Sequence, residues 1–172
     1  MLFRSRERHD NGRTAVQGRY LRGRKFGHWV WFDAEGRREQ EGTYRNGQRH
    51  GDWRRFYASG DRSEQGEYRN DLRDGLWTQW YPDGALAEQA HWRQGELAGP
   101  YMSYHRNGQI RELGRHREGR RHGDWTIYHA NGNKQSRGSY HLGELDGTWR
   151  VYLPDGTLIE TVDYDRDRKS VV

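Results

Sequence analysis

Histidine and aspartate are the residues of this chain that could support catalysis or metal binding, because it contains nine histidines and no cysteine. The lack of cysteine excludes disulfides, thiol nucleophiles and thiolate metal ligands. His50 and His122 share a position in a repeating pattern, as do Asp52 and Asp124. Zinc holds its ligands at about 2.0–2.1 Å, and paired catalytic carboxylates lie about 5–9.5 Å apart. Whether the two histidines can share a metal ion, or the two aspartates can act as a catalytic pair, therefore depends on how far apart the fold places them.

Tryptophan recurs with a period of 24 residues, and tyrosine fills the one gap. A single enzyme core has no reason for this regularity, whereas a stack of similar structural units does. We call these positions the Trp marks, and they are Trp29, Trp53, Trp77, Tyr101, Trp125 and Trp149. Three residues after each mark stands a second aromatic, namely Phe32, Phe56, Trp80, Tyr104, Tyr128 and Tyr152. The pattern predicts about six units between Gly18 and Thr161.

A third column, nine residues before each Trp mark, is tyrosine in most units and departs most clearly at His116. The repeat pattern extends over residues 12–164, which we predict to be a repeat array. Residues 1–11 do not fit it, and we expect a truncated or irregular N-terminal segment there. Residues 165–172 read as a polar, disordered C-terminal tail.

The composition favours a repeat fold over disorder. Few aliphatic residues are available for a conventional core, which is typical of disordered chains. However, the net charge is only +5 and aromatic residues make up 13% of the chain. Because the aromatic residues are evenly spaced, each unit can bury two or three large rings. A quasi-one-dimensional repeat protein distributes its apolar surface in this way.

The turn residues indicate strands. The chain has 23 glycines at fixed offsets, and Asn-Gly or Asp-Gly pairs recur where tight turns are expected. Each unit is predicted to form two antiparallel strands, such as residues 53–57 and 63–69. The predicted fold is all-β, an elongated, twisted, single-layer meander of β-hairpins.

This fold separates the candidate catalytic residues. Neighbouring strands lie about 4.8 Å apart, so one unit advances the sheet by roughly 10 Å. Equivalent residues three units apart, such as His50 and His122, are then roughly 30 Å apart and cannot share an ion. The sequence predicts no catalytic residue, no metal site and no cofactor.

The aromatic columns define two expected faces. Trp and Tyr marks on adjacent strands are expected to stack into ladders, one of them covered by loops such as residues 23–27. The second aromatic lies an odd number of residues from the mark and is expected on the opposite face. There it could form an open stripe for binding.

The units resemble MORN repeats, and specifically the bacterial variant found in the YwqK family of antitoxins. The likeness is clearest in Y-R-N-G-Q-R-H-G-D-W at residues 44–53 and in Y-M-S-Y-H-R-N-G at residues 101–108. It covers nearly all of residues 12–164. Departures occur at Asp71, Ala90, Trp92 and His116, so the fourth and fifth units are expected to be irregular. The resemblance implies a non-enzymatic role, which ranges from toxin neutralisation to scaffolding and lipid association.

Charge narrows the choice of partner. Only Lys25, Lys134 and Lys169 are lysine among 30 basic residues, and arginine favours bidentate contacts with acidic groups. Acidic residues interleave with the basic ones, which disfavours nucleic acid. The leading hypothesis is an antitoxin or immunity protein that binds a partner toxin directly. The predicted contacts are Arg55, Tyr57, Tyr81, His105 and His129.

The alternative hypothesis is a scaffold that associates with anionic membrane lipid or the cell envelope. It would use the Arg-rich residues 22–25 and 117–121. The chain has no apolar run suited to export or membrane spanning, so the expected compartment is the cytoplasm. An envelope or periplasmic location would require an N-terminal signal that precedes this sequence.

Overall fold

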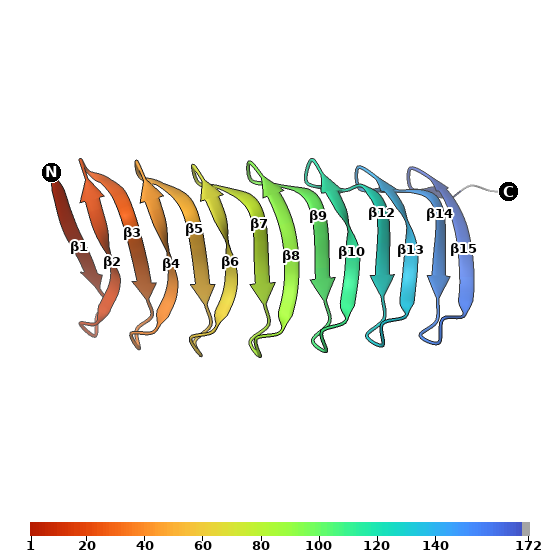
Figure 1. Cartoon of the computed structure of the whole chain (residues 1–172), viewed down its shortest axis with the longest axis horizontal. Coiled ribbons are helices and arrows are strands. Elements are labelled where there is room, and N and C mark those ends of the chain that lie inside the picture. The colour runs from red at the N-terminus through yellow and green to blue at the C-terminus, as the bar shows by residue number, and fades with distance from the viewer. Residues whose placement is uncertain (170–172) are drawn as a thin grey trace. The chain divides into compact units, whose positions relative to one another are not determined.

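The computed structural model describes residues 1–169, and its regular elements are all β-strands. The chain divides into two compact units, and Figure 1 shows that successive strands within each unit run side by side. The first comprises Met1–Gly84 and Arg93–Gly95, and the second comprises Ala85–Trp92 and the chain from Glu96 onward. The aromatic pattern gave no sign of this division, because the columns run through both units.

In the first unit, strands that follow one another in the chain pair antiparallel. They are β1 (Leu2–Arg8), β2 (Thr14–Leu21), β3 (Arg24–Phe32), β4 (Arg38–Arg45), β5 (Gln48–Phe56), β6 (Arg62–Arg69) and β7 (Leu72–Trp80). The prediction of an all-β meander of hairpins is confirmed here. The strands begin earlier than predicted, since β5 starts at Gln48 rather than at Trp53.

The second unit continues the same alternation. Its strands are β8 (Leu86–Arg93), β9 (Glu96–Tyr104), β10 (Ile110–Arg117), β11 (Arg120–Arg121), β12 (Gly123–Tyr128), β13 (Lys134–His141), β14 (Glu144–Tyr152), β15 (Leu158–Asp165) and β16 (Arg168–Lys169). Both β11 and β12 pair with β10, so together they replace one long strand. This interruption agrees with the expected irregularity of the fifth sequence unit.

A glycine bulge just before each Trp mark explains why the strands are longer than predicted. Gly27 has a φ of 68°, a conformation that glycine adopts easily. Opposite it the register skips, because Gln17 pairs with Val30 and Arg19 pairs with Phe26. The strand therefore runs through the double-glycine segment as a bulge. The prediction that residues 23–27 form a loop over an aromatic ladder is wrong.

The indole of each Trp mark lies flat on a glycine of the preceding strand. A Cβ on Gly18, Gly42, Gly66, Gly114 or Gly138 would lie 2.1–2.3 Å from the indole of the next mark. The indole Nε1–H then donates to the carbonyl oxygen of the residue after that glycine, at 3.2 Å from Trp29 to Arg19 and 2.9 Å from Trp149 to Ser139. A buried indole needs such an acceptor. Trp29 and Trp125 are 0% and 1% exposed.

One unit departs from this arrangement at two positions together. Ala90 replaces the glycine and is buried, and Tyr101 replaces the tryptophan. The smaller phenol leaves room for the alanine methyl group, and its hydroxyl donates to the Glu88 carboxylate at 2.9 Å. Burial, and then the hydrogen bond to Glu88, raise the pKa of Tyr101 to about 12. The two sequence departures are therefore one compensated change.

The tyrosine column completes the predicted ladder. In the first unit, rings alternate as Tyr20, Trp29, Tyr44, Trp53, Tyr68 and Trp77, with centroids 5.0–6.0 Å apart in edge-to-face contacts. In the second unit His116, Trp125, Tyr140 and Trp149 do the same. Aromatic pairs prefer this geometry over face-to-face stacking. We call the side of each unit that carries this ladder the Trp face.

Both chain ends are more regular than expected. The N-terminal segment forms β1, whose Phe3 stacks on Tyr20 at 5.6 Å between centroids. Residues 165–169 were expected to be disordered, but Arg168 pairs with Asp165 in a short hairpin. Its turn is held by Asp167, which exchanges hydrogen bonds with the backbone of Leu145. The rest of the predicted tail, residues 170–172, lies outside the described residues.

Close packing of tryptophan on glycine predicts a strong, specific coupling. Gly138→Ala should destabilise the protein by about 2–3 kcal/mol, because the methyl group forces the Trp149 indole out of its place. The double variant that also carries Trp149→Tyr should be less destabilised than the sum of the two single variants, by about 1 kcal/mol or more. Urea unfolding of the four proteins measures this coupling.

The natural pair supplies a control for that cycle. Ala90→Gly should cost about 1–2 kcal/mol, from backbone entropy and the lost burial of one methyl group. Strict additivity of Gly138→Ala and Trp149→Tyr would show that the indole does not need the glycine.

Candidate functional site

Four of the five predicted contact residues share one position in the repeat, four residues after a Trp mark, where each strand meets its hairpin turn. They are Tyr57, Tyr81, His105 and His129. The rings there reach the next hairpin. The Tyr57 hydroxyl donates to the Trp80 carbonyl at 2.6 Å, and Nε2 of His105 and His129 hydrogen-bonds the carbonyls of Tyr128 and Tyr152 at 2.9 and 3.0 Å. Tyr81 shares the position. The structure thus gives this column a role in joining hairpins, and its role in partner binding stays a prediction.

Asparagine side chains reinforce the same junction. Asn107 donates to the Ala130 carbonyl at 2.6 Å, and Asn131 donates to that of Pro154 at 2.7 Å. Each asparagine also accepts a hydrogen bond from the backbone two residues later, which fixes its own turn. The Asn-Gly pairs, which the sequence marked only as turns, therefore also connect successive hairpins.

Arg55, the fifth predicted contact, lies on the Trp face. Its side chain is 58% exposed, and its Nε lies 3.9 Å from a carboxylate oxygen of Glu64. Beside it stands a group of cations on this face that the residue pattern did not reveal. These cations stand four residues before the Trp marks, at Lys25, Arg49, Arg73 and Arg121.

Each of these cations lies over an indole. Lys25 Nζ is 4.5 Å from the ring centroid of Trp29, Arg73 Cζ is 3.9 Å from that of Trp77, and Arg121 Cζ is 4.3 Å from that of Trp125. Arg49 Cζ is 4.0 Å from the Tyr68 ring. We call Lys25, Arg49 and Arg73 of the first unit the cation row. It covers the aromatic ladder that loops were expected to cover.

Carboxylates fix the guanidinium groups of the row. Arg49 donates from Nε to Asp71 at 3.1 Å, and Arg73 forms a 2.5 Å ion pair with Glu64. The Glu64 side chain is only 10% exposed, whereas those of Arg49 and Arg73 keep 34% and 23% exposure. The row therefore presents cations whose orientation is set before any ligand arrives. Asp71, which replaces a loop glycine, accounts for one of these contacts.

The second aromatic column is partly covered as well. Arg38 Cζ lies 5.6 Å from the Phe56 ring centroid, and Arg62 Cζ lies 5.6 Å from that of Trp80. Phe56 and Trp80 are only half-buried. The column is therefore a set of aromatic rings with arginine contacts, rather than the bare stripe that the spacing predicted.

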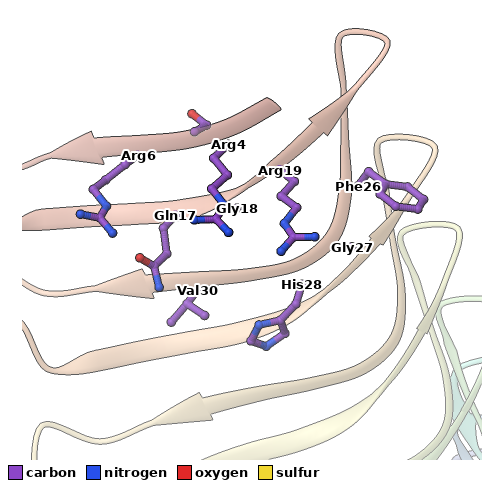
Figure 2. A pocket seen from close by; sticks show the side chains of 10 residues that line it. Arg4, Arg6, Gln17, Gly18, Arg19, Phe26, Gly27, His28 and Val30 are labelled. Carbon is purple, nitrogen blue, oxygen red and sulfur yellow. The ribbon is translucent and has the colours of Figure 1, made fainter. Parts of the chain in front are cut away.

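The face opposite the Trp face carries a hollow in the first unit (Figure 2). Its volume is about 600 Å³, and side chains of β1, β2 and β3 line it. The polar ones are Arg4, Ser5, Arg6, Gln17, Arg19 and His28, and no carboxylate is among the lining residues. Figure 2 shows Arg4, Arg6 and Arg19 directed to the same side of the sheet.

Within residues 1–169, the histidines and acidic residues form no group of three or more that could hold a metal ion. In that part of the chain, no helix has the length and apolar character needed to cross a bilayer.

The pKa of His116 is lowered from its ordinary value of 6.5, first by burial and then by the nearby charge of Arg121. The ring lies between Tyr101 and Trp125, at 5.0 and 5.2 Å between centroids, and its buried Nδ1 has no hydrogen-bond partner among residues 1–169. Tyrosine occupies this place in regular units such as that of Tyr140. His116 is therefore a weak point of the ladder when it is protonated.

This shift predicts a pH-dependent stability. The unfolded chain binds a proton at His116 below about pH 6.5, before the folded protein does, so stability falls as pH drops through that window. His116→Tyr should therefore reduce the loss of stability between about pH 7 and about pH 5. Thermal unfolding at both pH values tests this. Tyr140→His, the converse change beside the same Arg121, should enlarge the loss, and an unchanged pH dependence in both variants would contradict the assignment.

Comparison with known proteins supports the repeat assignment. The model of the MORN repeat variant matches residues 49–70, 73–94, 121–141 and 145–166, which together make up about half of the chain. None of the curated proteins compared with the chain matches it. The matched segments contain the glycine, Trp-mark and tyrosine columns described above. The chain therefore belongs to the MORN repeat-variant family.

Proposed function

We propose that this repeat protein neutralises a partner toxin by binding an acidic surface of the toxin to its Trp face. The observation that carries the proposal is the cation row, in which arginines are held over buried indoles by rings and carboxylates. Ordering a long, flexible side chain on binding costs about 0.5–1.5 kcal/mol. Because Arg49 and Arg73 are already ordered, little of this cost remains for them.

The spacing of the row suits an extended acidic surface. Equivalent cations in adjacent repeats stand two strands apart, or roughly 10 Å. A partner with acidic groups at a similar spacing could contact Lys25, Arg49 and Arg73 together. Arg55, one of the predicted contacts, adds an exposed guanidinium beside the row.

The membrane alternative finds less support in its predicted segments. Residues 22–25 and 117–121 are tight turns with the adjoining strand ends. Lys25 and Arg121 already lie over indoles, and Arg117 is 3.4 Å from Glu118 in an ion pair. Each segment then presents two exposed arginines, Arg22 and Arg24 in one and Arg117 and Arg120 in the other, whereas firm binding to anionic lipid needs a cluster of about four or more.

The proposal predicts that Arg55→Glu weakens toxin binding in a protein that still folds, although the new carboxylate stands opposite Glu64 on the neighbouring strand and lowers stability somewhat. The assay is co-expression with each toxin-like product of the neighbouring reading frames, followed by calorimetric titration of any pair that restores growth. Arg55→Glu should reduce affinity about tenfold or more, because it places a like charge against an acidic surface. Arg137→Glu, an exposed arginine of the second unit, is the matched control and should leave affinity unchanged.

Two outcomes would overturn this function. If no toxin-like neighbour is neutralised, the antitoxin role is wrong. If the protein co-sediments strongly with phosphatidylglycerol vesicles but not with phosphatidylcholine vesicles, and binds no such neighbour, the membrane scaffold replaces it.

A further inference from the structure

The face opposite the Trp face carries a second ordered set of charges, all within the first unit. They lie at nearly one level along the strands. The register places Arg4 opposite Arg19, His28 opposite Thr43, Asp52 opposite Glu67 and Glu67 opposite Asp74. At the glycine bulges the level shifts slightly, since Arg19 pairs with Phe26, two residues before His28, and Thr43 lies in the register shift opposite β5. We call this set the charge row, and from β1 to β7 it reads Arg4, Arg19, His28, Thr43, Asp52, Glu67 and Asp74. It is basic at one end and acidic at the other.

The basic end is the hollow of Figure 2. Arg4 and Arg19 are direct cross-strand neighbours, an arrangement of like charges that is destabilising. Among the described residues, neither guanidinium has an ion-pair or hydrogen-bond partner, and neither does that of Arg6. The fold thus holds three arginines together without an anion to offset their repulsion.

The acidic end repeats this situation with opposite sign. Asp52 and Glu67 are exposed direct neighbours on β5 and β6, and within residues 1–169 neither has a cation at ion-pair distance. Asp74 on β7 continues the series and is bound on one side by Arg69 at 2.9 Å. Two uncompensated clusters of opposite charge therefore lie on one face of the same unit.

The two ends are too far apart to neutralise each other. Arg19 on β2 and Glu67 on β6 are separated by four strand spacings, or roughly 19 Å. Exposed charges at that separation are largely screened, since the Debye length is about 8 Å at physiological ionic strength. A partner molecule with complementary charges would offset the repulsion within each cluster.

We propose that this molecule is a second copy of the chain, bound face to face through the charge row. In a two-fold interface, if one residue contacts another, the second contacts the first in return. A two-fold axis along β4 sets β1, β2 and β3 against β7, β6 and β5 of the second copy. Arg4 then faces Asp74, Arg19 faces Glu67 and His28 faces Asp52, and the uncharged Thr43 lies on the axis.

A single axis therefore matches all the charges of the row. A small anion bound in the hollow would neutralise the arginines. It would not explain why the acidic residues stand at the strand positions that mirror those of the arginines. The proposal is independent of the toxin-binding function, because it uses the opposite face of the sheet.

Charge reversal tests the interface, with the oligomeric state measured by sedimentation equilibrium. The wild-type protein should be a dimer at low salt and dissociate as salt rises. Arg4→Glu with Arg19→Glu makes both ends acidic, and Glu67→Arg with Asp74→Arg makes both ends basic. Each double variant should dimerise at least about 100-fold more weakly, because like charges then face each other.

Mixing the two double variants distinguishes a lost charge interface from a loss of folding. An equimolar mixture of the two double variants should form a heterodimer, since every contact is again between opposite charges. A chain that carries all four substitutions should form a homodimer again. The control is Arg115→Glu with Arg137→Glu, exposed arginines of the second unit, which should leave the dimer intact.

A wild-type protein that is monomeric at low salt would overturn the proposal. So would double variants that fold, as shown by circular dichroism, but do not form the heterodimer. If the wild type is monomeric and binds inorganic phosphate in a manner that Arg4→Glu abolishes, the hollow is an anion site instead.

Discussion

The contact between a tryptophan indole and a bare glycine is the constraint on which the rest of the structure depends. Because the indole lies flat on the backbone of the preceding strand, it is buried without a second layer of structure above it. Its Nε1–H meets a carbonyl of that strand, so the burial leaves no polar group unsatisfied. A single sheet with few aliphatic residues gains most of its apolar burial in this way.

The bulge at the glycine two residues before the mark is part of the same device. Because of the bulge, the strand stays paired with its neighbour even though several of its residues lie opposite a single residue of that neighbour. The long cations four residues before the mark lie over the outer surface of the rings. Arginine suits this position, because its planar group stacks on a ring while its edge pairs with a carboxylate.

The sequence predicted the features that recur in every unit. The period, the hairpins and the ladder of Trp and Tyr follow from columns of large residues and turn signals, and these survive any local variation. The strand bounds did not follow, because a glycine with positive φ is typical of both a loop and a bulge. The link between Ala90 and Tyr101 was also missed, since it depends on which strand an indole overlies.

The candidate binding surfaces were harder to predict, because they depend on register between strands. Tyr57, His105 and His129 read as exposed ring residues near strand ends, but their hydrogen bonds to the next hairpin emerge only when equivalent turns are set side by side. Arg4 and Arg19 are fifteen residues apart in the chain, and nothing in the sequence marks them as neighbours. Clusters of charge in a repeat protein therefore become apparent only when residues on neighbouring strands are compared.

The hydrogen bonds between successive hairpins have a consequence for how such a chain forms and changes length. The side-chain hydrogen bonds of Tyr57, His105 and Asn107 each join residues that are 23 positions apart. None of these hydrogen bonds therefore requires the closure of a long loop. A low separation between contacting residues favours rapid folding that can start at any repeat. Duplication or deletion of one 24-residue segment would leave every such partner available in the adjoining copy, so genetic copying can vary the length of the array without redesigning its interior.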